Sequence, residues 1–170
     1  LVGTLRLLQA MQATGVRRIV FFSSGGPVYG NPDVVPVPET HALRPISSYG
    51  VVKASIESYL GMYGQLGVID PMVLRPSNPY GPRQSTSGVQ GAIGAFLRCA
   101  REGRPVTLWG DGGTVRDYLY VDDLVELAVT AGLSGATGVY NAGSGEGHSL
   151  LEICRLIGDI TGRPLEVRHE

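Results

Sequence analysis

Residues 17–24 read Arg-Arg-Ile-Val-Phe-Phe-Ser-Ser, a short apolar run bounded by charge on one side and by glycine on the other. This pattern predicts a parallel strand that is buried on both faces. A helical segment from Tyr49 and a second apolar run at residues 71–75 follow it along the chain. Strand, helix and strand in this order form a right-handed crossover. The first half is therefore predicted to be part of a doubly wound α/β sheet, with ligands at the carboxyl ends of its strands.

The other predicted elements follow from apolar spacing and from residues that start or end helices. A helix is expected over residues 1–14 with Gly15 as its stop, and the Gly- and Pro-rich residues 25–45 predict a long loop. From Pro82 onward the elements are shorter and mixed, which indicates a smaller lobe. Its expected strands are residues 106–109, 118–121 and 139–142. Three helices are expected in it. The first ends at Gly103, the second runs from Asp122 as its cap to Gly132 as its stop, and the third runs from the Ser149–Glu152 capping box to Gly162.

Tyr49 and Lys53 lie four residues apart at the start of a segment with apolar residues at helical spacing. Side chains four apart share one helix face, so the phenol and the ammonium are expected to point into one pocket. An adjacent cation favours the phenolate and lowers the tyrosine pKa from its usual value of about 10. Tyr49 then becomes a general base for a sugar or alcohol hydroxyl. The spacing by itself also fits an ordinary amphipathic helix, and this alternative stays open at this point.

Composition and charge restrict the kinds of partner. The 170 residues carry 14 basic and 15 acidic side chains, a net charge of -1, without a basic block. A nucleic-acid partner and an anionic membrane are therefore not expected, and no apolar run approaches the roughly 20 residues of a membrane helix. Cys99 and Cys154 sit among apolar residues of expected helices and are interpreted as buried thiols, which fits a cytoplasmic protein. The histidines lack metal-ligand spacing, so no metal is expected.

Seven stretches occur in one order over nearly the whole chain. They are Gly3–Leu8, Phe22–Gly30, Tyr49–Lys53, Leu74–Gln84, Gly110–Gly112 with Arg116–Tyr118, Val121–Asp123, and Tyr140–Gly145. Each is modest alone, but together they resemble the extended short-chain dehydrogenases/reductases, specifically the NAD-dependent nucleotide-sugar epimerases and dehydratases. The resemblance implies part of a Rossmann-type doubly wound parallel sheet over residues 1–81. It implies a smaller mixed α/β substrate-binding lobe over residues 82–170, interleaved with the first in the fold and truncated.

The resemblance also implies the catalytic and cofactor-binding residues. Tyr49 would remove the proton from the sugar 4-hydroxyl while C4 gives a hydride to NAD, and Lys53 would hold the nicotinamide ribose. Where family members have a serine or threonine that assists the base, this chain has Gly25, so the hydroxyl is expected from Ser24 or a water. The residues expected to contact NAD are Ser23, Ser24, Tyr49, Lys53, Pro76 and Ser77.

The second lobe is expected, by the same resemblance, to bind a nucleotide-diphosphate sugar. Arg116 would bind the diphosphate and Asn78 would donate its amide to phosphate. Trp109 would place a ring beside uracil, and Ile93 would approach the substrate through its main chain. From the residues alone three alternatives stay open, which are Arg116 in a surface ion pair with Asp117, Asn78 as a turn residue and Trp109 as a core aromatic.

Some features depart from a complete family member. The strand and Gly-x-x-Gly-x-x-Gly turn that open such enzymes are not in the sequence, so the chain is expected to lack about 90 preceding residues at roughly 30 per βα unit. The similar spacing at Gly88-x-x-Gly91-x-x-Gly94 follows serine and threonine instead of a buried strand. Gly143-x-Gly145-x-Gly147 lacks the third glycine of the fingerprint. Neither is expected to be a cofactor turn.

The preferred function is an NAD-dependent UDP-hexose 4-epimerase of which this chain is a part. Dehydration is disfavoured, because the dehydratases carry Thr-Asp-Glu where this chain has Gly25-Gly26-Pro27. A nucleotide-sugar reductase or decarboxylase, and a non-catalytic module that binds a nucleotide sugar or a partner, stay open as alternatives. An uncovered edge of the parallel sheet is expected to favour a homo-oligomer.

Overall fold

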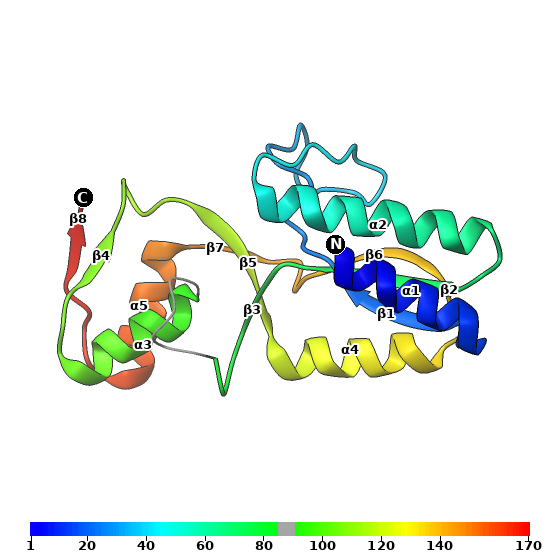
Figure 1. The fold of residues 1–170 in the computed structure, drawn as a ribbon. Coiled ribbons are helices and arrows are strands. Elements are labelled where there is room, and N and C mark those ends of the chain that lie inside the picture. Colours follow the sequence, from blue (N-terminus) through cyan, green and yellow to red (C-terminus); the bar gives the residue numbers. More distant parts are fainter. Residues whose placement is uncertain (85–90) are drawn as a thin grey trace. The chain divides into compact units, whose positions relative to one another are not determined.

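A computed structural model of the chain describes residues 1–84 and 91–170 (Figure 1). These residues divide into two compact units. The first unit comprises residues 1–77 and 123–142, and the second comprises residues 78–122 and 143–170. Both units combine helices with parallel strand pairs, so the α/β class predicted from the sequence is confirmed. The predicted boundary after residue 81, with an NAD-binding and a sugar-binding side, stays a prediction.

The first unit is built on a parallel sheet with the strand order β1-β2-β6. β1 (Arg18–Phe22) pairs with β2 (Asp70–Pro76), and β2 pairs with β6 (Gly138–Ala142). The register aligns Phe22 with Leu74, and therefore brings the carboxyl ends of β1 and β2 to the same edge of the sheet. The two buried apolar runs of the sequence are thus neighbouring parallel strands, as predicted.

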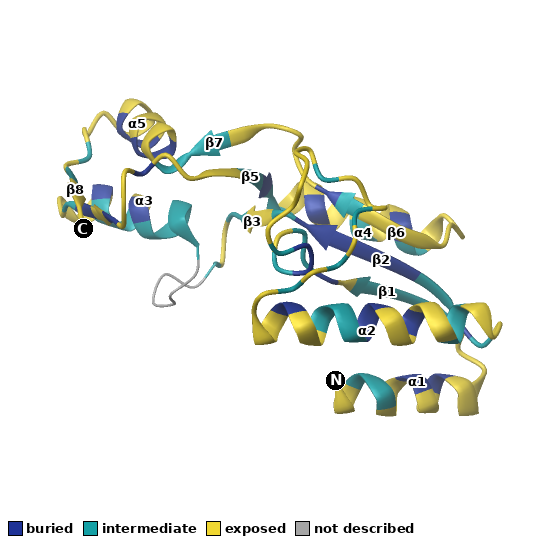
Figure 2. Cartoon of the chain, turned by 90° about the horizontal axis from the view of Figure 1, so that it is seen from above, coloured by how far each residue is buried: buried dark blue, intermediate teal, exposed yellow. Residues whose placement is uncertain are grey.

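Helices cover both faces of this sheet (Figure 1). α1 (Val2–Thr14) and α2 (Ser48–Gln65) pack on one face, in a buried cluster that includes Leu8, Leu60 and Val73. α4 (Val121–Leu133) packs on the other face against Met72 and Leu74 of β2. Successive β2 side chains point to opposite faces, which explains why Met72, Val73 and Leu74 are all apolar and why the strand is buried from residue 72 to residue 76 (Figure 2). The arrangement is doubly wound.

The loop over residues 25–47 contains neither helix nor strand and leads into α2. Ser47 caps this helix by accepting a hydrogen bond from the Gly50 N–H at 3.1 Å. Gly50 itself packs against the loop, because a Cβ at this position would lie 2.2 Å from the carbonyl oxygen of Pro27. The first turn of α2 is therefore fixed by a cap and by close backbone packing.

The second unit has shorter elements. Its core contains Phe96, Val106 and Ile157. Its strands form one sheet in the order β3-β5-β7, in which β5 and β7 are antiparallel, and a separate parallel pair of β4 and β8. The strand bounds are β3 (Asn78–Tyr80), β4 (Val106–Leu108), β5 (Val115–Tyr120), β7 (Gly147–Ser149) and β8 (Val167–His169). The helices are α3 (Ala92–Glu102) and α5 (Leu150–Thr161), and α5 begins with the predicted Ser149–Glu152 capping box.

The predicted ends of α4 are wrong. The helix begins at Val121 and runs through Gly132 to Leu133, so Asp122 is not its cap and Gly132 is not its stop. The Arg18 guanidinium explains the extension, because it donates hydrogen bonds to the carbonyl oxygens of Ala131, Gly132 and Ala136. These bonds give further partners to carbonyls of the last helical turn and of the chain just after it, and a cation there is favoured by the helix dipole.

Candidate active site

Tyr49 and Lys53 lie on the first turns of α2, beside the carboxyl end of β1. The Lys53 Nζ atom donates a hydrogen bond to the carbonyl oxygen of Phe22 at 2.6 Å. It also lies 5.7 Å from the centre of the Tyr49 ring and 4.7 Å from that of Phe21. Tyr49 is 53% exposed, whereas Lys53 is half-buried. The helix thus presents a tyrosine to solvent with a cation beside its ring; the two side chains are neighbours, and their shared pocket stays a prediction.

Two effects act in opposite directions on Lys53. Burial lowers its pKa below the usual value, and the negative charge of Glu57 offsets part of this change. An ammonium group has three N–H donors. One donor goes to the Phe22 carbonyl, and the structure shows no further hydrogen bond of the Lys53 ammonium to any residue in ranges 1–84 and 91–170. The remaining donors suit a pair of vicinal hydroxyl oxygens such as those of a ribose.

The predicted cofactor-binding residues of the two strand ends lie close together. Backbone bonds join Ser23 N to Leu74 O at 2.7 Å and Gly25 N to Pro76 O at 2.8 Å. Ser77 N in turn donates to Ala142 O at 2.8 Å. The Ser23 hydroxyl is buried and donates to Glu57, whereas Ser24 is only half-buried. Of the two serines, Ser24 is therefore the one whose hydroxyl fits the predicted role beside Tyr49.

Gly25 occupies a tight place beside the end of β2. A Cβ there would lie 3.0 Å from the Pro76 carbonyl oxygen and 3.2 Å from that of Arg75. A serine or threonine would therefore require the backbone of β2 to move slightly. The glycine at this position fits the close packing of the two strand ends.

The predicted substrate-binding residues lie in the second unit. Arg116 is exposed on β5 and donates to the carbonyl oxygen of Val115 at 2.8 Å. The Asn78 amide donates to the carbonyl oxygen of Asp117 at 2.8 Å, which places it within the β3–β5 pairing. Trp109 is 83% exposed, so the alternative that it is a core aromatic is wrong. Ile93 is half-buried on α3 and packs against the core of this unit.

The Asp117 side chain occupies the Gly143–Gly147 turn. The Asp117 carboxylate accepts hydrogen bonds from Ser144 N at 2.9 Å, from Ser144 Oγ at 3.0 Å and from Gly145 N at 3.0 Å. A Cβ on Gly143 would lie 2.4 Å from a carboxylate oxygen of Asp117. The amides that could hold a phosphate thus hold a carboxylate. In the other weak glycine motif, Gly88 lies outside the described residues.

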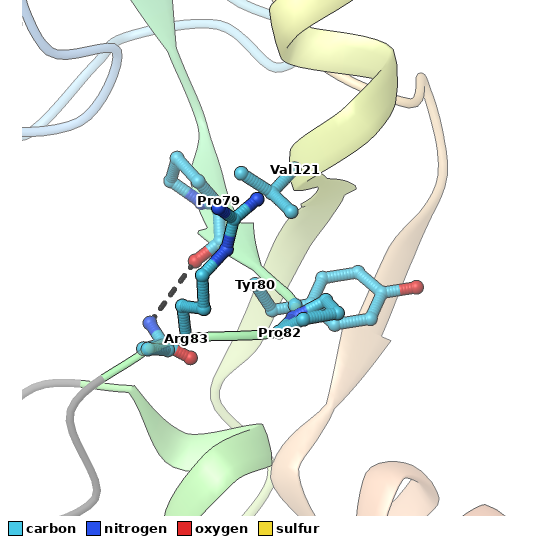
Figure 3. A pocket seen from close by; sticks show the side chains of 7 residues that line it. Pro79, Tyr80, Pro82, Arg83 and Val121 are labelled. Carbon is cyan, nitrogen blue, oxygen red and sulfur yellow. Dashed lines mark hydrogen bonds between the residues drawn. The ribbon is translucent and has the colours of Figure 1, made fainter.

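An open hollow of about 260 Å³ lies beside β3 (Figure 3). Tyr80, Pro82, Arg83 and Val121 are among its lining residues. Gln84 closes one side, with its Nε2 atom donating to Pro79 O at 3.3 Å. The chain that follows Gln84, residues 85–90, lies outside the described residues.

Sequence reasoning missed a buried charge next to the candidate base. Glu57 is buried and bonds to Arg75. A signal was present, because Glu57 follows Lys53 by four residues and so lies on the same helix face.

The described residues contain neither a metal-ligand cluster nor a membrane-spanning helix. Within residues 1–84 and 91–170, no three or more His, Cys, Asp and Glu side chains group as metal ligands. None of the helices in those same ranges has the length and apolar character needed to cross a membrane.

The sequence profile of the NAD dependent epimerase/dehydratase family matches residues 1–143. The chain belongs to this family. A UDP-glucose 4-epimerase from Mycolicibacterium smegmatis is 40% identical over 166 residues, which are 97% of this chain and 53% of that protein.

Solved structures of family members agree with the fold. The Thermus thermophilus UDP-glucose 4-epimerase in complex with NAD superimposes with a TM-score of 0.91 at 41% identity, over 99% of this chain and 56% of that one. The Thermotoga maritima UDP-glucose 4-epimerase with UDP-glucose gives a TM-score of 0.94 at 38% identity, over 100% of this chain and 55% of that one. This member of the epimerase/dehydratase family thus spans about half the length of these relatives.

Proposed function

We propose that this chain is the part of an NAD-dependent nucleotide-sugar 4-epimerase that carries the catalytic tyrosine and lysine, and that the substrate is a UDP-hexose. The observation that supports the proposal most strongly is the position of Lys53, bonded to the end of β1 and 5.7 Å from the Tyr49 ring. The identity of about 40% to a UDP-glucose 4-epimerase supports the choice of reaction and substrate.

Tyr49 is the general base of the proposed reaction. Its phenolate takes the proton of the sugar 4-hydroxyl as C4 loses a hydride, which leaves a 4-keto sugar. The neutral phenol then returns the proton to the 4-oxygen when the hydride comes back to the other face of C4. NAD supplies the hydride acceptor and donor when it is bound. Atoms and electrons balance over the cycle, so no external reductant is consumed.

Lys53 has two tasks in this proposal. Its cation stabilises the phenolate form of Tyr49, since opposite charges within a few ångströms favour the charged state. Its N–H donors beyond the one bonded to Phe22 hold the ribose hydroxyls of NAD. The Ser24 hydroxyl, half-buried after β1, completes the hydrogen bonds to the sugar 4-oxygen.

The second unit holds the nucleotide in this proposal. Arg116 is exposed and presents a guanidinium, whose planar fork fits diphosphate oxygens. Trp109 is 83% exposed, and a free indole face can stack on a uracil ring. The roles of Asn78 and Ile93 stay predictions, as does a homo-oligomeric state.

The test is conversion of UDP-galactose to UDP-glucose by the full product of the reading frame that encodes the chain, followed by ¹H NMR. Conversion without added reduced cofactor supports the epimerase. Turnover that consumes stoichiometric NADH or NADPH would assign a reductase instead, and release of carbon dioxide from a UDP-uronic acid would assign a decarboxylase.

A further inference from the structure

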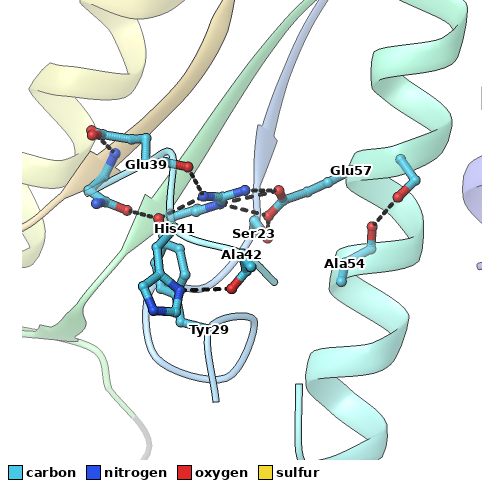
Figure 4. Close-up of polar contacts among 10 residues, drawn as sticks. Ser23, Tyr29, Glu39, His41, Ala42, Ala54 and Glu57 are labelled. Atoms are coloured by element: carbon cyan, nitrogen blue, oxygen red, sulfur yellow. Dashed lines mark hydrogen bonds and ion pairs between the residues drawn. The ribbon is translucent and has the colours of Figure 1, made fainter. Parts of the chain in front are cut away.

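A buried ion pair joins Glu57 of α2, four residues after Lys53, to Arg75 of β2, and Figure 4 shows the polar contacts around Glu57. The side chains of Glu57 and Arg75 are each 5% exposed, and Arg75 Nη2 lies 2.5 Å from Glu57 Oε2. Arg75 Nε adds contacts of 3.1 and 3.2 Å to the two carboxylate oxygens. Such a pair holds its geometry tightly, because removal of either charge would leave the other buried without a partner.

The end of β1 holds two successive turns of α2. The Ser23 hydroxyl donates to Glu57 Oε1, and the carbonyl oxygen of the preceding residue, Phe22, accepts from Lys53 Nζ at 2.6 Å. Phe22 at the end of β1 and Ser23 just after it thus contact two α2 side chains that are four residues apart. The position of Lys53 along the strand is therefore coupled to that of Glu57.

The network continues from Arg75 into the loop and β6. Arg75 Nη1 donates to the Tyr29 hydroxyl at 2.6 Å and to the Glu39 carbonyl oxygen at 3.3 Å. The Tyr29 hydroxyl donates to Asn141 Oδ1 at 2.7 Å. One hydrogen-bonded network therefore joins α2, the end of β1, β2, the loop and β6, and such networks select one arrangement of the elements that they join.

We propose that Glu57 is a positioning residue for the candidate active site: held by Ser23 and Arg75, it fixes the turn of α2 that carries Lys53 against the end of β1. The proposal rests on the proposed function, since it assigns Glu57 a part in that reaction. Glu57 acts through Lys53.

The charged groups near Lys53 determine the pH at which its ammonium loses a proton. On α2 itself, Tyr49 and Glu57 flank it. From β1 it contacts the Phe22 carbonyl and the Phe21 ring, and β2 contributes Arg75, the partner of Glu57. The loop groups Glu39 and Tyr29 contact Arg75, and His41 packs edge-on against the Tyr29 ring. Glu57 is the carboxylate that opposes the effect of burial on the Lys53 pKa.

Lys53 is the only lysine in the sequence, so it gives a single reporter signal. Chain labelled with lysine carrying ¹³C at Cε is titrated by NMR, as wild type and as Glu57→Gln. The variant keeps the size of the side chain but removes its charge. A fall of the Lys53 midpoint by about one pH unit is expected. An unchanged midpoint in folded Glu57→Gln would overturn the proposal.

Two further variants keep the experiment decisive. Ile56→Val removes one methylene from the neighbouring buried residue of α2 and leaves all the polar contacts intact, so the Lys53 midpoint is expected to stay at the wild-type value. If Glu57→Gln does not fold, the double variant Glu57→Met/Arg75→Leu replaces the whole pair by apolar groups, which proteins often tolerate. Because this variant removes opposite charges together, its readout is the kcat of the full reading-frame product, which is expected to fall as in Glu57→Gln; an unchanged kcat would overturn the proposal.

Activity of the full reading-frame product separates the two proposals. Glu57→Gln is expected to lower kcat on the order of 10–100-fold with a much smaller change in KM, since a displaced catalytic group costs rate more than binding. An unchanged kcat would reduce Glu57 to a structural role. If the Lys53 midpoint falls but the wild-type product has no epimerase activity, the proposed function fails and the placement of Lys53 by Glu57 stands.

Discussion

The two cysteines have different surroundings. Cys154 is buried in the core of the second unit, and Cys99 packs against that core while half-buried. Burial raises the pKa of the Cys154 thiol to about 11, and the neighbouring Cys99 adds to the rise. Because only the thiolate reacts with alkylating reagents, a higher pKa means a lower reactive fraction at any pH below it.

Iodoacetamide at pH 8 is therefore expected to label Cys99 before Cys154. A rise of the thiol pKa from its usual value of 9.0 to about 11 lowers the thiolate fraction roughly 100-fold at this pH. Peptide mass spectrometry over a time course measures both rates, and the chain unfolded in urea is the control in which the two rates should converge. Equal rates in the folded chain would contradict the burial of Cys154.

Single residues were predictable where spacing carries the information. The pairing of Tyr49 with Lys53 and the burial of Cys154 follow from positions along a helix. The exposure of Trp109 did not, since an isolated aromatic gives no periodic pattern. The contacts of Asp117 with the Gly143–Gly147 turn also require the fold, because they join residues about 27 positions apart in the chain.

The start of α2 depends on a residue without a side chain. A Cβ at Gly50 would lie 2.2 Å from the Pro27 carbonyl oxygen and 3.0 Å from Pro45 Cβ. Gly50→Ala is therefore expected to lower the free energy of unfolding by about 1–3 kcal/mol, as overpacking does. Urea unfolding followed by circular dichroism measures the change.

Gly61 is the matched control for this substitution. It lies in the same helix, is exposed, and a Cβ there would have no heavy atom within 4 Å. Gly61→Ala is expected to raise stability by about 0.5–1 kcal/mol, because alanine loses less backbone entropy than glycine in a helix. If both variants change stability by the same amount, the close packing of Gly50 has no energetic effect and this account of the α2 start is incorrect.

The capping box of α5 is a second test at the scale of the element. Ser149 accepts from Glu152 N at 3.2 Å, and the Glu152 carboxylate accepts from Ser149 N at 2.7 Å. Ser149→Ala is expected to cost about 1 kcal/mol in urea unfolding. In Ser58→Ala, a mid-helix control on α2 whose hydroxyl only donates back to Ala54 O, a change within about 0.5 kcal/mol is expected. Equal losses would argue against the capping role.

The longer elements were predictable, and of the three-residue strands β4 was expected, at residues 106–109. The helices with a glycine in the left-handed conformation at their end, at Gly15, Gly103 and Gly162, were placed correctly from the sequence. The three-residue strands β3, β7 and β8 were missed, since three residues are too few to show alternation. The end of α4 was misplaced because Arg18, more than 110 positions away, supplies its partners.

At the scale of the whole molecule, the chain spans about half the length of the relatives that it matches. The strand and glycine-rich turn expected to hold the NAD phosphates are not among its 170 residues. The isolated 170-residue polypeptide is therefore expected not to interconvert UDP-glucose and UDP-galactose in the presence of NAD. Formation of UDP-galactose, detected by NMR with purified polypeptide, would contradict this expectation.

The parallel sheet of the first unit was predictable because buried strands and their crossover helix leave strong patterns. The chain returns to this unit at residues 123–142, and that return rests on contacts between α4 and the far face of β2. Apolar spacing shows that α4 is a helix, but it does not say which sheet face the helix covers.

The most direct measurement compares Tyr49→Phe with Tyr59→Phe in the full product of the reading frame. Both tyrosines are exposed on α2, and only Tyr49 has the Lys53 ammonium against its ring. Tyr49→Phe is expected to lower UDP-galactose turnover roughly 10²–10⁴-fold with an unchanged circular dichroism spectrum, while Tyr59→Phe retains wild-type turnover. Near wild-type turnover in Tyr49→Phe would contradict the assignment of Tyr49 as the base, and with it the central claim.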